Sequence, residues 1–138
     1  MKFESLAPIF CVQNVPASIE HYVNVLGFEK AWDWGEPATF GCVCRDEIAI
    51  FLCENGQGQP GTWLSIFVDD VDALYAEYQR SGANIRQPPT DFQWGIREMN
   101  IEDIDGHRLR IGHGIDTPSD NVNICGYSSW HAWPPRLR

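Results

Sequence analysis

The sequence predicts an α+β fold in which one strand-helix-three-strand unit occurs twice in tandem. A strand-like run is followed by an apolar helical stripe and three further strand-like runs, and this order begins again at residue 63. The spacing agrees, because Val12 precedes Val68 by 56 residues and Gly27 precedes Gly82 by 55. Two units with such similar spacing indicate an internal repeat.

The first unit opens with residues 7–12, which alternate around apolar side chains as a strand does. Asn14 can cap a helix that has Pro16 in its first turn and that ends at Gly27. The apolar stripe of this helix contains Ile19, Tyr22, Val23 and Leu26. Three strands are predicted to follow it, at residues 28–34, 40–45 and 48–52.

The second unit repeats the order. Residues 63–68 predict a strand, Asp70 a helix cap and Gly82 the end of that helix. Its apolar stripe contains Val71, Leu74, Tyr75 and Tyr78. A short strand near Ile85 and a hairpin then complete the unit, with the hairpin strands at residues 97–103 and 108–112.

The predicted hairpin has one apolar and one polar face. The apolar face carries Met99, Ile101, Leu109 and Ile111. The polar face carries Glu98, Asn100, Glu102, Arg108 and Arg110. Two interpretations fit this face: it lines a polar cavity, or it is a solvated face on which glutamates pair with arginines across the hairpin.

The units are joined by a glycine-rich segment, which divides the chain into modules at residues 1–54 and 62–113, a linker at 55–61 and a C-terminal extension at 114–138. The linker contains a G-x-G-x-x-G pattern. A dinucleotide-binding loop needs a helix directly after this pattern, so that helix amides hold the pyrophosphate. Here a strand is expected next, and Pro60 lacks an amide hydrogen, so the segment is interpreted as a linker.

Composition excludes several classes of function. With 43% hydrophobic and 12% aromatic residues among 138, the chain can bury a core. A net charge of −9 repels phosphate backbones, so a nucleic-acid partner is not expected and a cationic small molecule is favoured. The apolar runs are too short to span a membrane and no signal peptide is recognisable, so cytoplasmic residence is expected.

The five cysteines show no zinc-site spacing. Four lie in apolar strand-like runs, so buried thiols in a reducing compartment are expected. Cys42 and Cys44 would share a strand face, but no further metal ligands accompany them.

Three stretches, LGFEK (residues 26–30), VDDVDALYAEY (68–78) and WGIREMNIEDIDGHRLRI (94–111), resemble the vicinal oxygen chelate superfamily. This superfamily includes glyoxalase I, extradiol dioxygenases and bleomycin resistance proteins, and the similarity covers roughly residues 5–113. The residue pattern is most similar to that of the bleomycin-binding proteins. The resemblance implies two βαβββ modules whose curved sheets enclose a cleft, usually in a homodimer.

Enzymes of this superfamily hold a divalent metal ion with histidine and glutamate side chains. Carried over by the resemblance, the first histidine falls at Ala7 or Pro8, the second at Trp63 or Ser65, and the glutamate at Arg110. Neither alanine nor tryptophan can hold a divalent cation, and the permanently protonated guanidinium of Arg110 repels one. The sequence therefore predicts no metal, no cofactor and no catalytic residue.

The bleomycin-binding branch is similar in lacking the metal site, which implies capture of an aromatic, cationic, antibiotic-like ligand in a dimer cleft. If Leu64, Ile66 and Val68 pack on the helix, their strand turns the alternating aromatic side chains to the cleft. The predicted ligand-binding residues are Trp32, Trp34, Phe40, Trp63, Ser65, Phe67, Phe92, Trp94, Glu98, Asn100 and Arg110.

Two alternatives stay open. One is a glyoxalase- or dioxygenase-type metalloenzyme whose metal site is displaced to Glu98, His113 and a group of the second subunit; the other is a non-catalytic ligand sensor. His21 and His107 are expected on the surface. The aromatic C-terminal extension is expected to pack on the domain or on a partner subunit.

Overall fold

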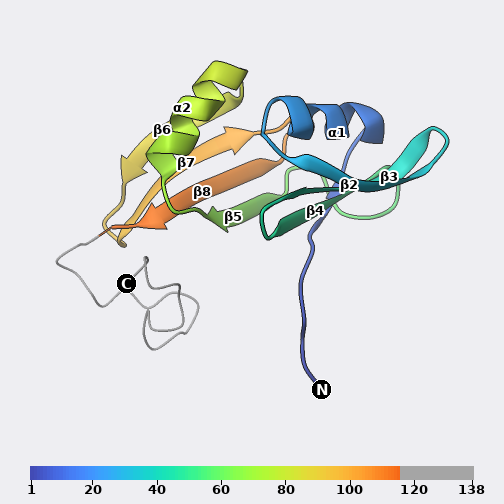
Figure 1. The fold of residues 1–138 in the computed structure, drawn as a ribbon, viewed down its shortest axis with the longest axis horizontal. Helices are drawn as coiled ribbons and strands as arrows, with labels where there is room; N and C mark the ends of the chain where they lie inside the picture. The colour runs from blue at the N-terminus through green and yellow to red at the C-terminus, as the bar shows by residue number, and fades with distance from the viewer. Residues whose placement is uncertain (116–138) are drawn as a thin grey trace.

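The computed structural model describes residues 1–115, which contain two helices and eight strands (Figure 1). The first half comprises β1 (Ile9–Cys11), α1 (Val15–Asn24), β2 (Glu29–Gly35), β3 (Ala38–Arg45) and β4 (Ile48–Cys53). The second half comprises β5 (Trp63–Phe67), α2 (Val71–Ser81), β6 (Asn84–Asp91), β7 (Ile96–Glu102) and β8 (Arg108–Gly114). The repeated order of elements is therefore confirmed, and the predicted tail packing concerns residues outside the described part.

Each half forms its own four-stranded sheet. The first sheet has the order β1-β4-β3-β2 and the second the order β5-β8-β7-β6. In both, the opening strand pairs in parallel with the last strand of its half, and the other pairs are antiparallel. The two helices lie on the same side of the sheets (Figure 1). We call the opposite side of each sheet its open face.

The helix caps follow the sequence prediction. The side chain of Asn14 accepts a hydrogen bond from the amide of Ala17 at 2.8 Å, and Asp70 caps α2 by accepting from the amide of Ala73 at 3.0 Å. Gly82 ends α2 in the left-handed conformation, with φ of 83°. Neither helix within residues 1–115 is long and apolar enough to cross a membrane.

α1 ends earlier than predicted, at Asn24 instead of Gly27. The helix ends there because backbone groups after Asn24 form hydrogen bonds with side chains from elsewhere in the chain. The carbonyl oxygen of Leu26 accepts from the hydroxyl of Tyr78 at 2.8 Å and from the guanidinium of Arg45 at 2.9 Å. Gly27 itself has φ of 75°, so it turns the chain into β2 after the helix has ended.

Gly27 allows Arg45 to approach the backbone, which gives a testable difference between two glycines. A Cβ at Gly27 would lie 2.5 Å from Nη1 of Arg45, whereas a Cβ at Gly82 meets nothing within 4 Å. Both residues have positive φ. We expect Gly82→Ala to lower the free energy of unfolding by about 1 kcal/mol and Gly27→Ala by about 2 kcal/mol, because only the latter also displaces Arg45.

Urea unfolding followed by circular dichroism measures this difference. Displacing Arg45 has a second consequence, because its hydrogen bonds hold the pKa of Glu77 below the usual value. In Gly27→Ala that pKa should return towards the usual range, as NMR titration would report, while Gly82→Ala leaves it unchanged. Equal stability losses in the two variants would refute the contact.

The strand predicted near Ile85 is longer than expected, because β6 runs through Pro88 and Pro89. β6 is the edge strand of the second sheet, so the amide of every second residue points away from β7, and a proline at such a position costs no ladder bond. Its register with β7 shifts between Gln87 and Thr90, where the two prolines lie. A proline pair that argues against a central strand is therefore compatible with an edge.

One apolar core joins the two halves beneath both helices. Tyr22 on α1 donates its hydroxyl to Oδ2 of Asp103, in the turn between β7 and β8, at 2.7 Å. Tyr78 on α2 donates to the carbonyl oxygen of Leu26 in the first half. Each helix is thus tied to the other half by a buried tyrosine.

These tyrosines predict a loss of stability at alkaline pH. Burial and the Asp103 carboxylate raise the pKa of Tyr22 well above 10.0, and burial raises that of Tyr78 to about 12. The folded state holds both protons more tightly than the unfolded chain does. Their contribution to stability is therefore complete below the unfolded pKa and is lost as pH rises through the folded values.

We expect the free energy of unfolding, measured in urea, to fall between about pH 10 and pH 12. The fall should be smaller in the double variant Tyr22→Phe/Tyr78→Phe. Tyr75→Phe, on the same helix as Tyr78, is the control and should keep the wild-type slope. A wild-type slope in the double variant would show that other groups govern alkaline unfolding.

His107 corrects the sequence prediction, because it is fully buried between the two halves and not on the surface. Its Nδ1 accepts from the amide of Thr62 at 3.0 Å, so Nε2 carries the proton and donates to the carbonyl oxygen of Cys11 at 2.7 Å. The ring stacks on Phe10 with centroids 4.2 Å apart. The imidazole therefore links β1 to the segment that precedes β5.

Candidate functional site

The open face of the first sheet carries a cluster of aromatic rings. The ring of Trp32 on β2 lies 5.3 Å from those of Phe40 on β3 and Phe51 on β4, and the two phenylalanine rings are 5.7 Å apart. The side of β3 that faces α1 is fixed by Gly41, where a Cβ would lie 3.0 Å from Ile19. Phe40 therefore faces away from the helix.

Two tryptophans of this face are open to solvent. Trp34 pairs with Phe40 in the strand register and is 71% exposed, and Trp32 is 39% exposed. Large exposed rings of this kind offer flat surfaces on which another aromatic ring can stack. Phe51 was not among the predicted site residues. Its alternation with the buried Ile50 and Leu52 is the signal that would have placed it on the open face.

The open face of the second sheet begins at β5. Ile66 is buried in the core, whereas Trp63 and Phe67 are 58% and 37% exposed, so the strand turns its aromatic residues away from α2 as the alternation predicts. Ser65 lies between them and is exposed. The guanidinium of Arg108 lies 5.3 Å from the centre of the Trp63 ring, within the range of a cation–π interaction.

The glutamates and arginines of this face pair across the hairpin. Nε and Nη2 of Arg110 each donate a hydrogen bond to the carboxylate of Glu98, the one from Nη2 at 3.0 Å. These hydrogen bonds raise the pKa of Arg110. Arg108 bonds Glu102 and Asn100, each at 3.2 Å. The pairing interpretation of the polar face is thus realised, and Arg110, Glu98 and Asn100 lie together on the open face.

The residues at the family's metal positions do not fit a divalent ion. Arg110 stands opposite Ser65 in the register of β8 and β5, so a guanidinium occupies the place of the glutamate. Ala7, at the first position, has no donor side chain. Within residues 1–115, no group of three or more His, Cys, Asp or Glu side chains is arranged to hold a metal.

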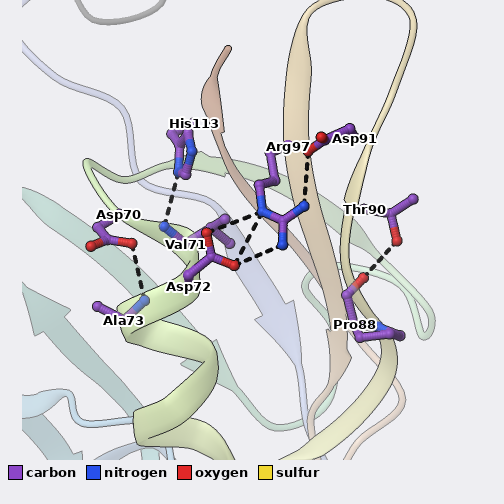
Figure 2. Close-up of polar contacts among 9 residues, drawn as sticks. All are labelled: Asp70, Val71, Asp72, Ala73, Pro88, Thr90, Asp91, Arg97 and His113. Atoms are coloured by element: carbon purple, nitrogen blue, oxygen red, sulfur yellow. Dashed lines mark hydrogen bonds and ion pairs between the residues drawn. The ribbon is translucent and has the colours of Figure 1, made fainter.

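His113 is engaged at the start of α2, as Figure 2 shows. Its Nδ1 accepts from the amide of Val71 at 3.0 Å. Beside it, Arg97 reaches from β7 to Asp72 at 2.8 Å and to Asp91 at 2.8 Å (Figure 2). These hydrogen bonds lower the pKa of Asp72. The group therefore anchors α2 and β6 to the hairpin.

Phe92 and Trp94 form a separate pair. Their rings stack on each other with centroids 4.5 Å apart and planes inclined by 11°, in the segment between β6 and β7. No ring contact within residues 1–115 joins them to the cluster of the first sheet. The structure thus brings the predicted aromatic residues together in three groups, on the first sheet, on β5 and at this segment.

Burial shifts the pKa values of several cysteine and histidine side chains considered in the sequence analysis. It raises the pKa of the Cys42 and Cys53 thiols, as expected of small buried side chains. Cys125 lies outside the described residues. His21, expected on the surface, is half-buried; burial lowers its pKa, and its Nε2 has no hydrogen-bond partner among residues 1–115. The side of α1 that carries His21 is therefore more buried than the polar residues next to it in the sequence suggest.

A further cavity in the described part of the chain lies elsewhere. It measures about 660 Å³ and lies between α2, β5 and the turn that joins β3 to β4. Of the predicted ligand-binding residues, only Phe67 borders it. The open faces and this cavity are therefore distinct features.

Comparisons with known proteins agree with this architecture. A family model described as the Glyoxalase/Bleomycin resistance protein/Dioxygenase superfamily matches residues 5–111. Among solved structures, TioX from Micromonospora sp. ML1 is 18% identical with a TM-score of 0.72, over 80% of this chain and 98% of that chain. A glyoxalase-related enzyme from Clostridium phytofermentans is 19% identical with a TM-score of 0.70, over 83% and 98%.

A superfamily member from Sphaerobacter thermophilus DSM 20745 is 23% identical with a TM-score of 0.67, over 80% of this chain and 97% of that chain. No protein with a curated function matches the chain. Likeness at these identities shows the fold, while the family model spans most of the sequence. The chain therefore belongs to the glyoxalase/bleomycin resistance protein/dioxygenase superfamily.

Proposed function

We propose that this protein is a metal-independent binding protein that sequesters an aromatic, cationic, antibiotic-like molecule in a homodimer. The ligand stacks on tryptophan and phenylalanine rings of the open faces, and no bond in it is broken. The observation that carries the proposal is the aromatic open face of the first sheet, where Trp32, Phe40 and Phe51 cluster beside the exposed Trp34.

The polar face of the second sheet supports binding without a metal. Arg110 occupies the place of the family's metal-binding glutamate, and its guanidinium is bonded to Glu98. A displaced metal site built from Glu98 and His113 is disfavoured, because Glu98 is held by that arginine and Nδ1 of His113 accepts from Val71. The resemblance of the sequence to the bleomycin-binding proteins and the chemistry of these side chains both support binding without a metal.

The charge of the protein favours a cationic ligand. Arg110 is paired with Glu98, and Arg108 shares Glu102 with Arg86, so carboxylates offset most of the positive charge on the polar open face. The net charge of the chain is −9. A flat cation would therefore be attracted over long range by the acidic chain and held at short range by stacking on rings.

A second copy would complete the binding site. Trp34 and Trp63 leave 71% and 58% of their surface exposed on the open faces, an unusual position for large rings in a protein that acts alone. Covering these faces with the same faces of a second subunit would bury the rings and enclose the ligand between subunits. The proposal accordingly includes a homodimer.

Titration with metal-loaded bleomycin, followed by tryptophan fluorescence, tests the proposal. We expect quenching that saturates in the micromolar range, and at least a tenfold weaker affinity in Trp32→Ala/Trp34→Ala, since each lost stacking contact is worth about 1 kcal/mol. Trp94→Ala is the control for the loss of a fluorophore away from the cluster.

Elemental analysis of protein purified without chelators accompanies the titration. Sub-stoichiometric zinc, nickel, manganese and iron are expected. No quenching by the drug at micromolar concentrations would remove the drug assignment, and a stoichiometric metal would replace the binding function with an enzymatic one.

A further inference from the structure

The cavity of about 660 Å³ at the junction of the two halves, which we call the seam cavity, has the size of a small-molecule site. It lies on the helix-covered side of the second sheet, away from the open faces. Its walls include five buried side chains, those of Phe28, Ile66, Tyr78, Leu109 and Ile111. An apolar floor of this kind can hold an apolar ring or chain.

The entrance of the seam cavity is acidic. Asp46, Glu47 and Asp70 border it and are exposed. Within the described part of the chain, Arg45 is the one basic residue that borders it, and its guanidinium is bonded to both carboxylate oxygens of Glu77 at 2.7 and 3.0 Å. Among residues 1–115, neither Asp46 nor Glu47 forms an ion pair. The charge of the entrance therefore favours a cation.

The internal repeat supplies a second, independent observation. Ile66 and Tyr78 of the cavity correspond, 56 residues earlier, to Phe10 and Tyr22 of the first half. The corresponding corner beside Phe10 and Tyr22 is filled. The His107 ring stacks on Phe10 with planes inclined by 18°, and Tyr22 bonds the Asp103 carboxylate.

The difference between the two corners comes from the lengths of two turns. Five residues separate the paired Glu102 and Arg108 at the ends of β7 and β8, and the last of them is His107. Only two residues separate the paired Arg45 and Ile48 at the ends of β3 and β4. The shorter turn supplies no ring for the second corner, and the space remains as the seam cavity.

The filled corner indicates which group fits the open one. In it, a flat nitrogen heterocycle lies against an apolar wall and donates a hydrogen bond to the carbonyl oxygen of Cys11. Cys11 corresponds to Phe67, which borders the seam cavity. The open corner differs in its acidic entrance. We infer that the seam cavity binds a small organic cation in which a flat ring carries a protonated amine.

In this complex, the ring takes the place that His107 takes in the other half, against Ile66 and Tyr78. The ammonium group lies at the turn of Asp46 and Glu47, where charge attraction is strongest. This site goes beyond the proposed function, because it lies on the helix-covered side of the second sheet, whereas Trp32 and Trp34 lie on the open face of the first sheet. A ligand can therefore bind one site irrespective of the other.

An NMR titration of the full chain with 2-phenylethylamine tests the inference. We expect the amide signals of Ile48, Val68 and Ala73 to shift in a saturable way, while the indole signals of Trp32 and Trp34 stay in place. Phenylacetate, the carboxylate of matching size, should not bind, and 2-phenylethanol should bind more weakly than the amine. Affinity for the amine should fall with added salt.

The variant Asp46→Asn/Glu47→Gln should weaken amine binding about fivefold, since it removes two exposed charges. Asparagine tolerates the φ of 51° at position 46, so this turn should still form. Glu4→Gln/Glu20→Gln removes two exposed charges from residues that do not border the cavity and is the matched control. Trp32→Ala/Trp34→Ala should leave amine binding unchanged even though it weakens the drug binding proposed above at least tenfold.

Three results would overturn the inference. They are the absence of saturable shifts by about 10 mM amine, equal affinity for amine and carboxylate, and shifts confined to the open face. If the wild-type protein binds the amine but not the drug, the proposed function alone is refuted. If it binds the drug but not the amine, the seam-cavity site alone is refuted.

Discussion

Replacing His107 with alanine should lower the free energy of unfolding by about 3 kcal/mol or more. The change removes a fully buried ring that stacks on Phe10, and it leaves the amide of Thr62 and the carbonyl oxygen of Cys11 without partners. Two part-buried polar groups without partners and a cavity then act together. Because the ring joins the halves, the loss should appear in one cooperative urea transition, measured by circular dichroism and by tryptophan fluorescence.

His113→Ala is the matched control. It also removes one imidazole that accepts a backbone hydrogen bond, from Val71, but at a half-buried position. We expect its cost to stay near 1 kcal/mol. If His107→Ala lost no more than His113→Ala, the imidazole would not be the link between the halves.

Removing Arg110 should be the next most damaging change. Glu98 is 6% exposed, and its carboxylate is bonded by two nitrogens of Arg110. Arg110→Ala leaves that buried charge without a partner. We expect the free energy of unfolding to fall by about 2 kcal/mol, less than for a fully buried pair because the Arg110 side chain is 45% exposed.

The double variant Glu98→Leu/Arg110→Leu distinguishes a stranded charge from a general loss of packing. Replacing both partners by apolar side chains leaves no charge unpaired, so its stability should lie close to that of the wild type at neutral pH. Urea unfolding at neutral pH measures both variants. A double variant as unstable as Arg110→Ala would show that the pair matters through its shape and not through its charge.

The parts of the fold that the sequence predicts are those set by neighbours along the chain. Asn14 and Asp70 cap their helices because a cap bonds an amide three residues on. Gly82 ends α2 because its backbone adopts a left-handed conformation. The alternation of β5 predicts which of its residues reach the core, since side chains of a strand point to opposite faces in turn.

The parts that the sequence does not predict depend on contacts between the halves. His107 follows a tight turn, which is typical of a surface residue, and its two partners lie 45 and 96 residues away. α1 ends before Gly27 because side chains from elsewhere in the chain bond the carbonyl oxygen of Leu26. No local pattern contains this information, although the repeat itself identifies the corresponding positions.

In the candidate site, too, the features set by neighbours along the chain are the ones that the sequence predicts. Alternation placed Trp63, Phe67 and Arg110 on the side of the second sheet away from α2, and the family comparison gave Arg110 its significance. The partner of Arg110 followed from the hairpin register, which is local. Phe51 was not predicted from the sequence, although its alternation with the buried Ile50 and Leu52 assigns it to the open face of the first sheet.

A crystal structure of the protein with metal-loaded bleomycin tests the central claim most directly. We expect a dimer in which the flat rings of the drug lie on the open face that carries Trp32 and Trp34, and in which every bond to the metal is made by the drug. Drug rings seated away from the open faces, or a metal ion coordinated by side chains of this protein, would contradict it.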